Sequence, residues 1–253
     1  FNIEANILKH EEPIVQELAN EYLAEQGITI LNSVTLNSVS NDGNKPVITA
    51  NNENYTFDAV LYATGRRPNT TNIGLENTDI TTNERGAIVV NDTCESSVPG
   101  VYAVGDVNGG PQFTYISLDD FRIVFGALTG NGHYTLKDRK NIPYTTFLTP
   151  PLARVGLTEE DAINKGYTVK TKEMLVATMP RAHVNDNLKG AFKIVVDAES
   201  NLILGATLYS QSAEELINMI KVAMDNNIPY TYFKNQIFTH PTMAENLNDL
   251  CNF

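Results

Sequence analysis

Apolar residues change their spacing along the chain, and these changes predict its elements. Between residues 12 and 25 they recur every three or four positions, which indicates a helix that opens at Pro13 and ends at Gly27. The Asp-Gly pair within Asn41–Asn44 predicts a hairpin. Short apolar stretches predict strands at 1–3, 28–31, 34–40, 46–50, 55–57 and 59–63. We therefore expect residues 1–62 to form half of an α/β domain.

Residues 63–134 are predicted to hold two short strands and one helix. The strands are expected at 86–90 and 100–104, and the second leads into Gly105 and Asp106. Ser117 is the expected N-cap of the helix, with Asp119 and Asp120 in its first turn near the positive end of the helix dipole. Gly130 is expected to end the helix, and its predicted buried face consists of Leu118, Phe121, Phe125 and Leu128.

Residues 135–253 show successive strands followed by helices. Strands are predicted at 144–148, 153–157, 170–177, 191–198 and 202–210. Thr158 and Ser212 each begin an N-capping sequence, with Asp161 and Glu215 three residues further on. The helix after Ser212 has a predicted apolar face of Leu216, Ile217, Ile220 and Met224. This pattern indicates an α+β unit with an antiparallel sheet.

Composition narrows the range of partners. The 253 residues carry a formal charge of -12, which disfavours nucleic acid and anionic membrane surfaces as partners. No stretch approaches the roughly 20 apolar residues that a membrane span needs, and no export signal is recognisable. The two cysteines, Cys94 and Cys251, form no paired motif, and no metal-binding motif occurs. These features predict a cytoplasmic protein without a metal site.

Four segments together resemble a known family. They are Ala63–Asn69 (ATGRRPN), Gly100–Asp106 (GVYAVGD), Arg154–Ala162 (RVGLTEEDA) and Thr239–Glu245 (THPTMAE). In this order and spacing they resemble the FAD-dependent pyridine-nucleotide disulfide oxidoreductases, which include glutathione reductase, dihydrolipoamide dehydrogenase and mercuric reductase. Gln112–Asp120 and Met179–Ala182 are most similar to the reactive-chlorine-resistance and hypothiocyanous-acid-reductase branch.

The resemblance implies a fold, cofactors and a domain division. The expected fold is an α/β remainder of two nucleotide-binding domains plus an α+β dimerisation domain with an antiparallel sheet. Residues 1–62 would end the NAD(P)-binding domain, 63–134 would end the FAD-binding domain, and 135–253 would form the dimerisation domain. FAD and NAD(P)H are the expected cofactors, and a homodimer is the expected assembly.

The resemblance also assigns residues to the flavin. Asp106 would accept a hydrogen bond from the ribityl chain of FAD, and Gly105 would let the backbone approach it without a Cβ in the way. Phe113 and Thr114 would supply backbone before the helix that points at the flavin. Thr64 and Gly65 would lie against FAD at a crossover between domains. Arg66 and Arg67 fit either phosphate ligands or a solvated loop.

His240 is the strongest candidate for catalysis. Pro241 is expected at the first position of a helix, and Glu245 lies five residues beyond the histidine, close enough to accept one imidazole N–H. The other ring nitrogen would then act as a base for thiol–disulfide exchange. In the family this histidine reaches the redox cysteines of the other subunit. A capping histidine beside a solvated glutamate would show the same pattern.

Glu4 is a candidate ligand of the nicotinamide cofactor. It follows a predicted strand end, where an acid would bind the adenosine ribose of NAD. Lys9 and His10 would instead favour a 2′-phosphate. The sequence leaves the choice between NADH and NADPH open.

Several expected family features do not occur in the sequence. The G-x-G-x-x-G fingerprints and the C-x-x-x-x-C redox pair are missing, so a C-terminal fragment is expected. The first interpretation is part of a flavoenzyme that reduces a small-molecule disulfide or oxidant. The second is a catalytically inactive dimerisation module, and the third is a flavin reductase without redox cysteines. A single Cys251 near the end disfavours mercury chemistry.

Overall fold

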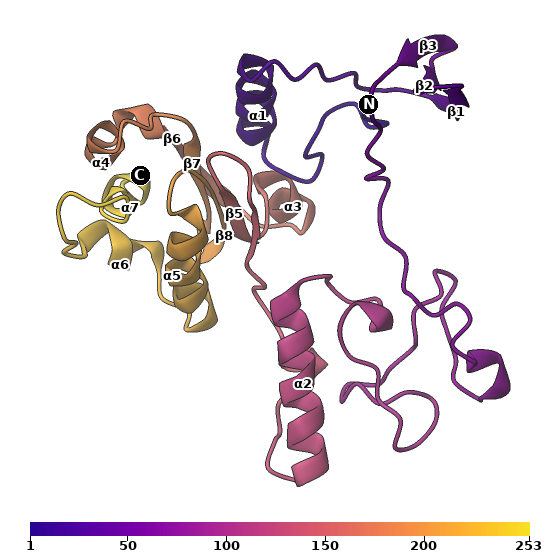
Figure 1. Cartoon of the computed structure of the whole chain (residues 1–253). Helices are drawn as coiled ribbons and strands as arrows, with labels where there is room; N and C mark the ends of the chain where they lie inside the picture. The colour runs from indigo at the N-terminus through magenta and orange to yellow at the C-terminus, as the bar shows by residue number, and fades with distance from the viewer. The chain divides into compact units, whose positions relative to one another are not determined.

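The computed structural model describes residues 1–253 and divides into two compact units (Figure 1). Phe1–Leu61 and Asn141–Phe253 form the first unit, and Tyr62–Lys140 form the second. None of the helices combines the length and the apolar character that a membrane-spanning helix needs.

Residues 1–61 hold one helix and a small sheet. Helix α1 spans Pro13–Glu25, with proline in its first turn and Gly27 beyond it at φ +79°, as the sequence predicts. Strands β1 (Leu36–Asp42), β2 (Lys45–Ala50) and β3 (Glu53–Thr56) form an antiparallel sheet, which confirms the predicted hairpin.

The strands predicted at 1–3, 28–31 and 59–63 do not form. Only short backbone contacts remain: the Asn2 N–H donates to the carbonyl of Leu31, and the Val34 N–H donates to the carbonyl of Asn2. A strand forms where a neighbouring strand pairs with its backbone N–H and C=O groups. These segments lack such neighbours within the first unit, because its sheets consist of β1–β3 and β4–β8.

Residues 141–253 form a five-stranded antiparallel sheet in the order β4-β5-β8-β7-β6, which confirms the predicted α+β architecture. The strands are β4 (Tyr144–Thr146), β5 (Leu152–Gly156), β6 (Val169–Leu175), β7 (Ala191–Asp197) and β8 (Ile203–Tyr209). The helices are α3 (Glu159–Asn164), α4 (Pro180–Val184), α5 (Ala213–Asp225), α6 (Tyr230–Asn235) and α7 (Asn246–Leu250).

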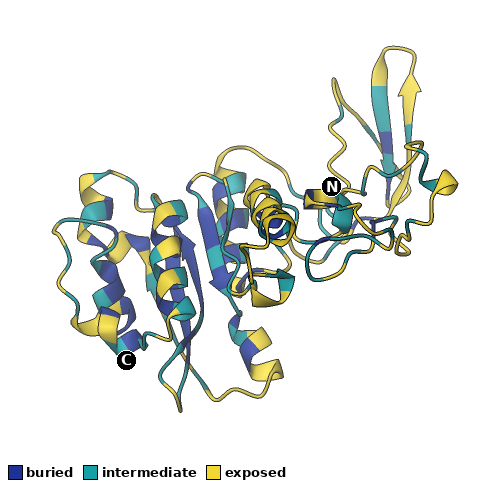
Figure 2. Cartoon of the chain, turned by 90° about the horizontal axis from the view of Figure 1, so that it is seen from below, coloured by how far each residue is buried: buried dark blue, intermediate teal, exposed yellow.

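The core of this region lies between the sheet and α5, where Figure 2 shows dark blue, buried strands. Leu216, Ile217 and Ile220 of α5 are buried, as predicted. Thr158 caps α3 through the predicted capping box. The prediction for Ser212 is wrong, since it lies at φ +66° and its side chain makes no cap hydrogen bond. Its left-handed backbone turns the chain into the helix instead.

Helix α1 packs on the same sheet. Its buried side chains, which include Val15 and Ala19, join Leu152 and Tyr209 in one apolar cluster. The Tyr22 hydroxyl accepts a hydrogen bond from the backbone N–H of Gly190 at 2.7 Å. Residues 1–61 and 141–253 are therefore connected by packing as well as by polar contacts.

Residues 62–140 have few regular elements. The strands predicted at 86–90 and 100–104 are reduced to isolated bridges, such as Thr82 with Ile88 and Glu95 with Tyr102. Short 3-10 turns occupy η1 (Leu75–Asn77), η2 (Gly105–Asn108) and η3 (Leu136–Asp138). The long helix α2 spans Thr114–Thr129 and ends at Gly130, as predicted for its C-terminus.

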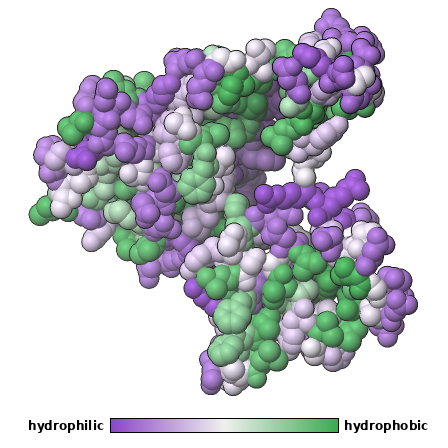
Figure 3. Space-filling view, in the orientation of Figure 1, coloured by the Kyte–Doolittle hydropathy of each residue, from purple (hydrophilic) through white to green (hydrophobic).

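The predicted start and orientation of α2 are wrong. Phe113 is the N-cap, so the helix begins three residues before Ser117. The inward face contains Ile116, Asp120 and Ile123. The four residues that were expected to be buried are exposed instead: Leu118, Phe121, Phe125 and Leu128. Figure 3 shows apolar side chains on the surface of this helix. The reason is that the buried carboxylate of Asp120 takes polar partners on the inward side of the helix.

Candidate active site

His240 and Glu245 lie together in the loop between α6 and α7. The His240 Nδ1 is 2.8 Å from the Glu245 Oε2. The imidazole is 71% exposed, whereas the carboxylate side chain is 16% exposed. The structure thus holds the histidine by a glutamate that is largely buried, while the ring itself faces outward.

The local frame of His240 differs from the sequence prediction. The helix begins at Asn246 with Glu245 as its N-cap, so Pro241 does not open a helix. The His240–Pro241 peptide bond is cis. Because the loop continues to Glu245 before the helix begins, the histidine is positioned by loop contacts rather than by a helix N-terminus.

The electrostatics of the pair define which nitrogen can work as a base. An ionised carboxylate only accepts hydrogen bonds, so Nδ1 carries the hydrogen and Nε2 is left as the acceptor in the neutral ring. The Glu245 Oε1 is buried and has no hydrogen-bond partner. This arrangement can take a proton at Nε2 and stabilise the resulting imidazolium through Glu245.

Neither cysteine suits redox chemistry. Both thiols are buried. Burial raises the pKa of Cys94 to about 11 and that of Cys251 to about 12. A thiol that stays protonated at neutral pH is a poor nucleophile. No group of three or more His, Cys, Asp or Glu side chains could hold a metal ion.

Gly105 and Asp106 form a turn that fits a hydroxyl-bearing ligand. Gly105 lies at φ +73°, and a Cβ there would lie 2.6 Å from the Oγ of Ser117 in α2. The Asp106 residue is exposed, and its carboxylate has no hydrogen bond or ion pair within the chain. Asp106 therefore presents an unpaired carboxylate beside a tight glycine turn.

Asp120 is a residue whose role the sequence reasoning missed. Its carboxylate is fully buried and accepts hydrogen bonds from the Gly105 N–H at 2.7 Å and the Asn108 Nδ2 at 2.9 Å. Arg139 pairs with the same carboxylate at 2.5 Å. Asp120 therefore fixes the Gly105–Asp106 turn. Its spacing on one helix face with Ile116 and Ile123 is the sequence signal that could have revealed it.

The remaining flavin candidates are also in residues 62–140. Phe113 caps α2, and the N–H groups of Thr114 and Tyr115 begin a helix that has no side-chain cap. Thr64 and Gly65 are exposed and make no hydrogen bond within the chain. Arg66 and Arg67, with Arg85, line a cavity of about 720 Å³.

Glu4 lies in a short turn of residues 1–61 and pairs with Lys9 across 2.5 Å. Its side chain is 42% exposed. The acid is therefore accessible to a ribose hydroxyl, but the adjacent ammonium group offers a contact to a phosphate as well. Glu4, which would favour NADH, is therefore in contact with Lys9, which would favour NADPH.

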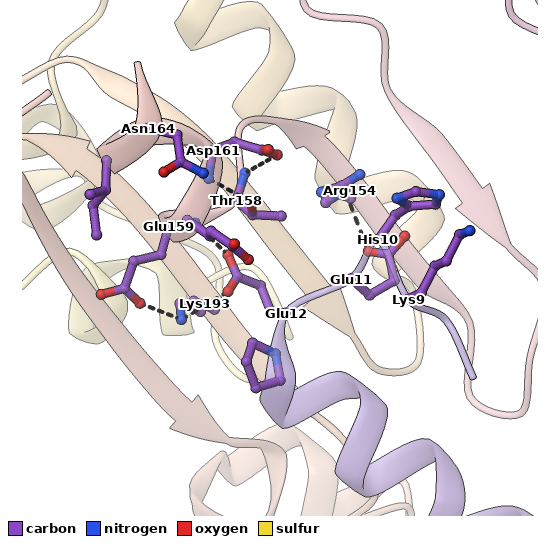
Figure 4. Close-up of a pocket in the computed structure, with 13 residues that line it drawn as sticks. Lys9, His10, Glu11, Glu12, Arg154, Thr158, Glu159, Asp161, Asn164 and Lys193 are labelled. Carbon is purple, nitrogen blue, oxygen red and sulfur yellow. Dashed lines mark hydrogen bonds and ion pairs between the residues drawn. The ribbon is translucent and has the colours of Figure 1, made fainter. Parts of the chain in front are cut away.

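A cavity of about 530 Å³ lies between residues 9–13 and the sheet, and Figure 4 shows the charged side chains that line it. Lys193 is 5% exposed and pairs with Glu12, Glu159 and Glu173. Burial alone would lower the pKa of Lys193, but the hydrogen bonds that its ammonium group donates to the three glutamates raise it overall. The ammonium group pairs with all three carboxylates. The ion pair between Lys193 of β7 and Glu12 connects the start of α1 to the sheet.

The chain belongs to the pyridine nucleotide-disulphide oxidoreductase family. The family profile described as "Pyridine nucleotide-disulphide oxidoreductase" matches residues 2–120. The profile described as its dimerisation domain matches residues 142–251, so the two cover most of the chain. Members of this family depend on FAD and NAD(P)H.

Particular relatives refine this assignment. The probable pyridine nucleotide-disulfide oxidoreductase RclA of Escherichia coli is 42% identical over 96% of this chain and 55% of its own length. The mercuric reductase of Staphylococcus aureus is 34% identical over 95% of this chain and 45% of its own length. The chain thus spans about half the length of these relatives.

Solved structures agree with the fold. The HOCl-induced flavoprotein disulfide reductase RclA of Escherichia coli matches with a TM-score of 0.94 at 40% identity, over 98% of this chain and 57% of that chain. LpdA of Mycobacterium tuberculosis matches with a TM-score of 0.89 at 22% identity, over 98% of this chain and 54% of that chain. The second likeness supports the fold alone.

Proposed function

We propose that this chain is the C-terminal part of a longer flavoprotein oxidoreductase. In that enzyme, electrons pass from NAD(P)H through FAD and a cysteine pair to a disulfide or a thiol-reactive oxidant. The observation that carries the proposal is the His240–Glu245 pair, held at 2.8 Å within a segment that matches the dimerisation domain of the family. The division into 1–62, 63–134 and 135–253 belongs to the same proposal.

FAD supplies two-electron transfer between the nicotinamide and the thiols when it is bound. Asp106 would accept a hydrogen bond from it, with Gly105 held in place by Asp120. Thr64, Gly65, Phe113 and Thr114 would provide further backbone contacts. Glu4 would bind the adenosine ribose of NADH.

His240 would act on the thiols rather than on the flavin. A thiol that attacks a disulfide must first lose its proton, and the departing thiolate must gain one. The Nε2 of His240 would take the first proton and return it to the leaving sulfur, while Glu245 keeps the ring in one tautomer. In a homodimer this histidine would face the cysteine pair of the partner subunit.

The test of this function is His240→Ala in the longer enzyme. Loss of a general base lowers turnover by about 10²- to 10⁴-fold, while reduction of the flavin by the nicotinamide survives. The matched control is His133→Ala, which removes an exposed histidine that is distant in sequence from His240. Unchanged turnover in His240→Ala would demote the residue to a structural one.

Nucleotide choice tests the assignment of Glu4. We expect a preference for NADH, and Glu4→Ala should weaken NADH binding by about 1–3 kcal/mol, the contribution of a charged hydrogen bond. A wild-type preference for NADPH would instead assign Lys9 to a 2′-phosphate.

Two other functions remain as alternatives. A dimerisation module without activity is favoured by the complete sheet and core of residues 141–253. A flavin reductase without redox cysteines is disfavoured, because a general base at His240 is needed for thiol chemistry and not for reduction of the flavin. The absence of nucleic-acid and membrane partners and a cytoplasmic location stay predictions.

A further inference from the structure

The loop that carries His240 and Glu245 has no regular secondary structure, although its chemistry needs a fixed geometry. It leaves α6 after Asn235 and enters α7 at Asn246. Exposed loops of this kind normally sample several conformations unless side chains hold their backbone. Side-chain hydrogen bonds from Thr242 and Asn248 hold the backbone of this loop.

Thr242 connects the backbone on either side of the histidine. Its hydroxyl donates to the carbonyl of Thr239 at 2.8 Å, immediately before His240. The same oxygen accepts a hydrogen bond from the backbone N–H of Glu245 at 3.2 Å. One hydroxyl thus uses its hydrogen and a lone pair to join the two backbone segments that carry the pair.

Asn248 holds the beginning of the loop from within α7. Its Nδ2 donates to the carbonyls of Phe233 at 2.6 Å and Gln236 at 3.0 Å, with the Lys234 carbonyl at 3.3 Å. These carbonyls lie at the C-terminal end of α6, where a helix leaves acceptors unsatisfied. The Asn248 side chain therefore ties the start of the loop to the helix that follows its end.

We propose that Thr242 and Asn248 are positioning residues for the His240–Glu245 pair. The proposal rests on the proposed function for its relevance to thiol chemistry. Thr242 sets the separation between the histidine and the glutamate, and Asn248 sets the path of the loop. Neither side chain needs to touch substrate, because their hydrogen bonds go to backbone atoms.

The side-chain chemistry of Thr242 separates this role from packing. Valine has nearly the shape of threonine but neither donates nor accepts, so Thr242→Val removes both hydrogen bonds. Serine keeps the hydroxyl and loses only a methyl group, so Thr242→Ser should retain the positioning. The matched control is Thr239→Val, because the Thr239 side chain is exposed and makes no hydrogen bond.

The test is a long-range 1H–15N spectrum of the imidazoles in the 253-residue chain, which contains four histidines. Loss of one set of signals in His240→Ala identifies the His240 ring. We expect the wild-type ring to show hydrogen on Nδ1. Thr242→Val should shift it to the mixed tautomers of an unrestrained histidine, whereas Thr242→Ser and Thr239→Val should keep the wild-type pattern.

Asn248→Asp is the second variant, since it keeps the shape and replaces the donors with acceptors that face three carbonyls. It should also convert the His240 ring to mixed tautomers. If Thr242→Val does not fold, as judged by circular dichroism, Asn248→Asp and Thr242→Ala decide the question. A wild-type tautomer in the folded variants would overturn the proposal.

Turnover in the longer enzyme separates this proposal from the proposed function. Thr242→Val should lower turnover by about 10- to 100-fold, the effect of a misplaced catalytic group, while Thr242→Ser stays within a few-fold. If His240→Ala leaves turnover unchanged, the proposed function fails, but the tautomer result still stands or falls by itself.

Discussion

Residues 141–253 and residues 62–140 use their apolar side chains in opposite ways. In the first region, helix α5 and the sheet enclose a core in which Phe192, Ile194 and Leu208 are fully buried. In the second, the long helix α2 leaves Phe121, Phe125 and Leu128 more than half exposed. A region with its own sheet can bury its apolar face internally, whereas one with isolated bridges leaves that face open.

The charged groups differ in the same way. Lys193 is 5% exposed and pairs with three glutamates. Lys137 in residues 62–140 pairs with Asp92 but is 78% exposed. Removing one partner of a buried ion pair leaves an unpaired charge in the interior and destabilises the fold, whereas a solvated ion pair contributes little to the stability. The comparison can be tested by removing matched side chains from the two regions.

The largest expected effect belongs to Lys193→Met. The change leaves the carboxylate of Glu12, which is 3% exposed, without its ammonium partner. Breaking a buried ion pair in this way destabilises a protein by about 3–5 kcal/mol. Urea unfolding followed by circular dichroism measures the loss. Lys137→Met is the control and should leave the midpoint unchanged, so equal losses would contradict the comparison.

Core truncation should give the next largest contrast. Ile220 is fully buried in α5, and Ile220→Ala should cost about 2–5 kcal/mol through lost burial and a cavity. Leu128 in α2 is 65% exposed, so Leu128→Ala should change the stability by less than about 0.5 kcal/mol. The two variants remove similar aliphatic side chains from helices. A large loss in Leu128→Ala would show that α2 buries this face against a partner.

Dimer formation and flavin binding test the expectations for the two regions. Residues 135–253 should pair with a second copy through a two-fold contact of more than roughly 2,000 Å². The 253-residue chain should bind no flavin, since Asp106 and α2 supply only one wall of the expected pocket. Light scattering and a visible spectrum report both properties. A strict monomer at micromolar concentration, or a yellow chain, would each contradict this expectation.

The two thiols should give the smallest effect, a gradual dependence of stability on pH. Burial raises the pKa of Cys94 to about 11 and that of Cys251 to about 12. An unfolded thiol ionises near pH 8.5. The unfolded chain therefore loses protons first, so this stabilisation is complete below about pH 8.5 and decreases as the pH rises toward 11 and 12.

Thermal melting between pH 8 and pH 11 measures this dependence. The midpoint should fall with pH, and Cys251→Ala should show a shallower fall because one titrating group is gone. At pH 8 a thiol reagent should label neither cysteine in the folded chain and both in denaturant. Rapid labelling of folded Cys94 or Cys251 would contradict their burial.

The sequence by itself determined the elements whose signals are local. The strands of residues 141–253 follow from alternating apolar stretches, and α1 follows from helical spacing between Pro13 and Gly27. The pairing of His240 with Glu245 also follows from a short separation along the chain, since five residues are enough to bring their side chains together.

Only the tertiary structure decided which faces are buried and what holds the site. Asp120 turns α2 inward because Gly105 and Arg139, distant in sequence, satisfy its carboxylate. Lys193 is buried because glutamates from the N-cap of α1, from α3 and from β6 converge on it. Periodicity records which residues prefer to leave water, but a buried charge is stable only where the fold assembles its partners.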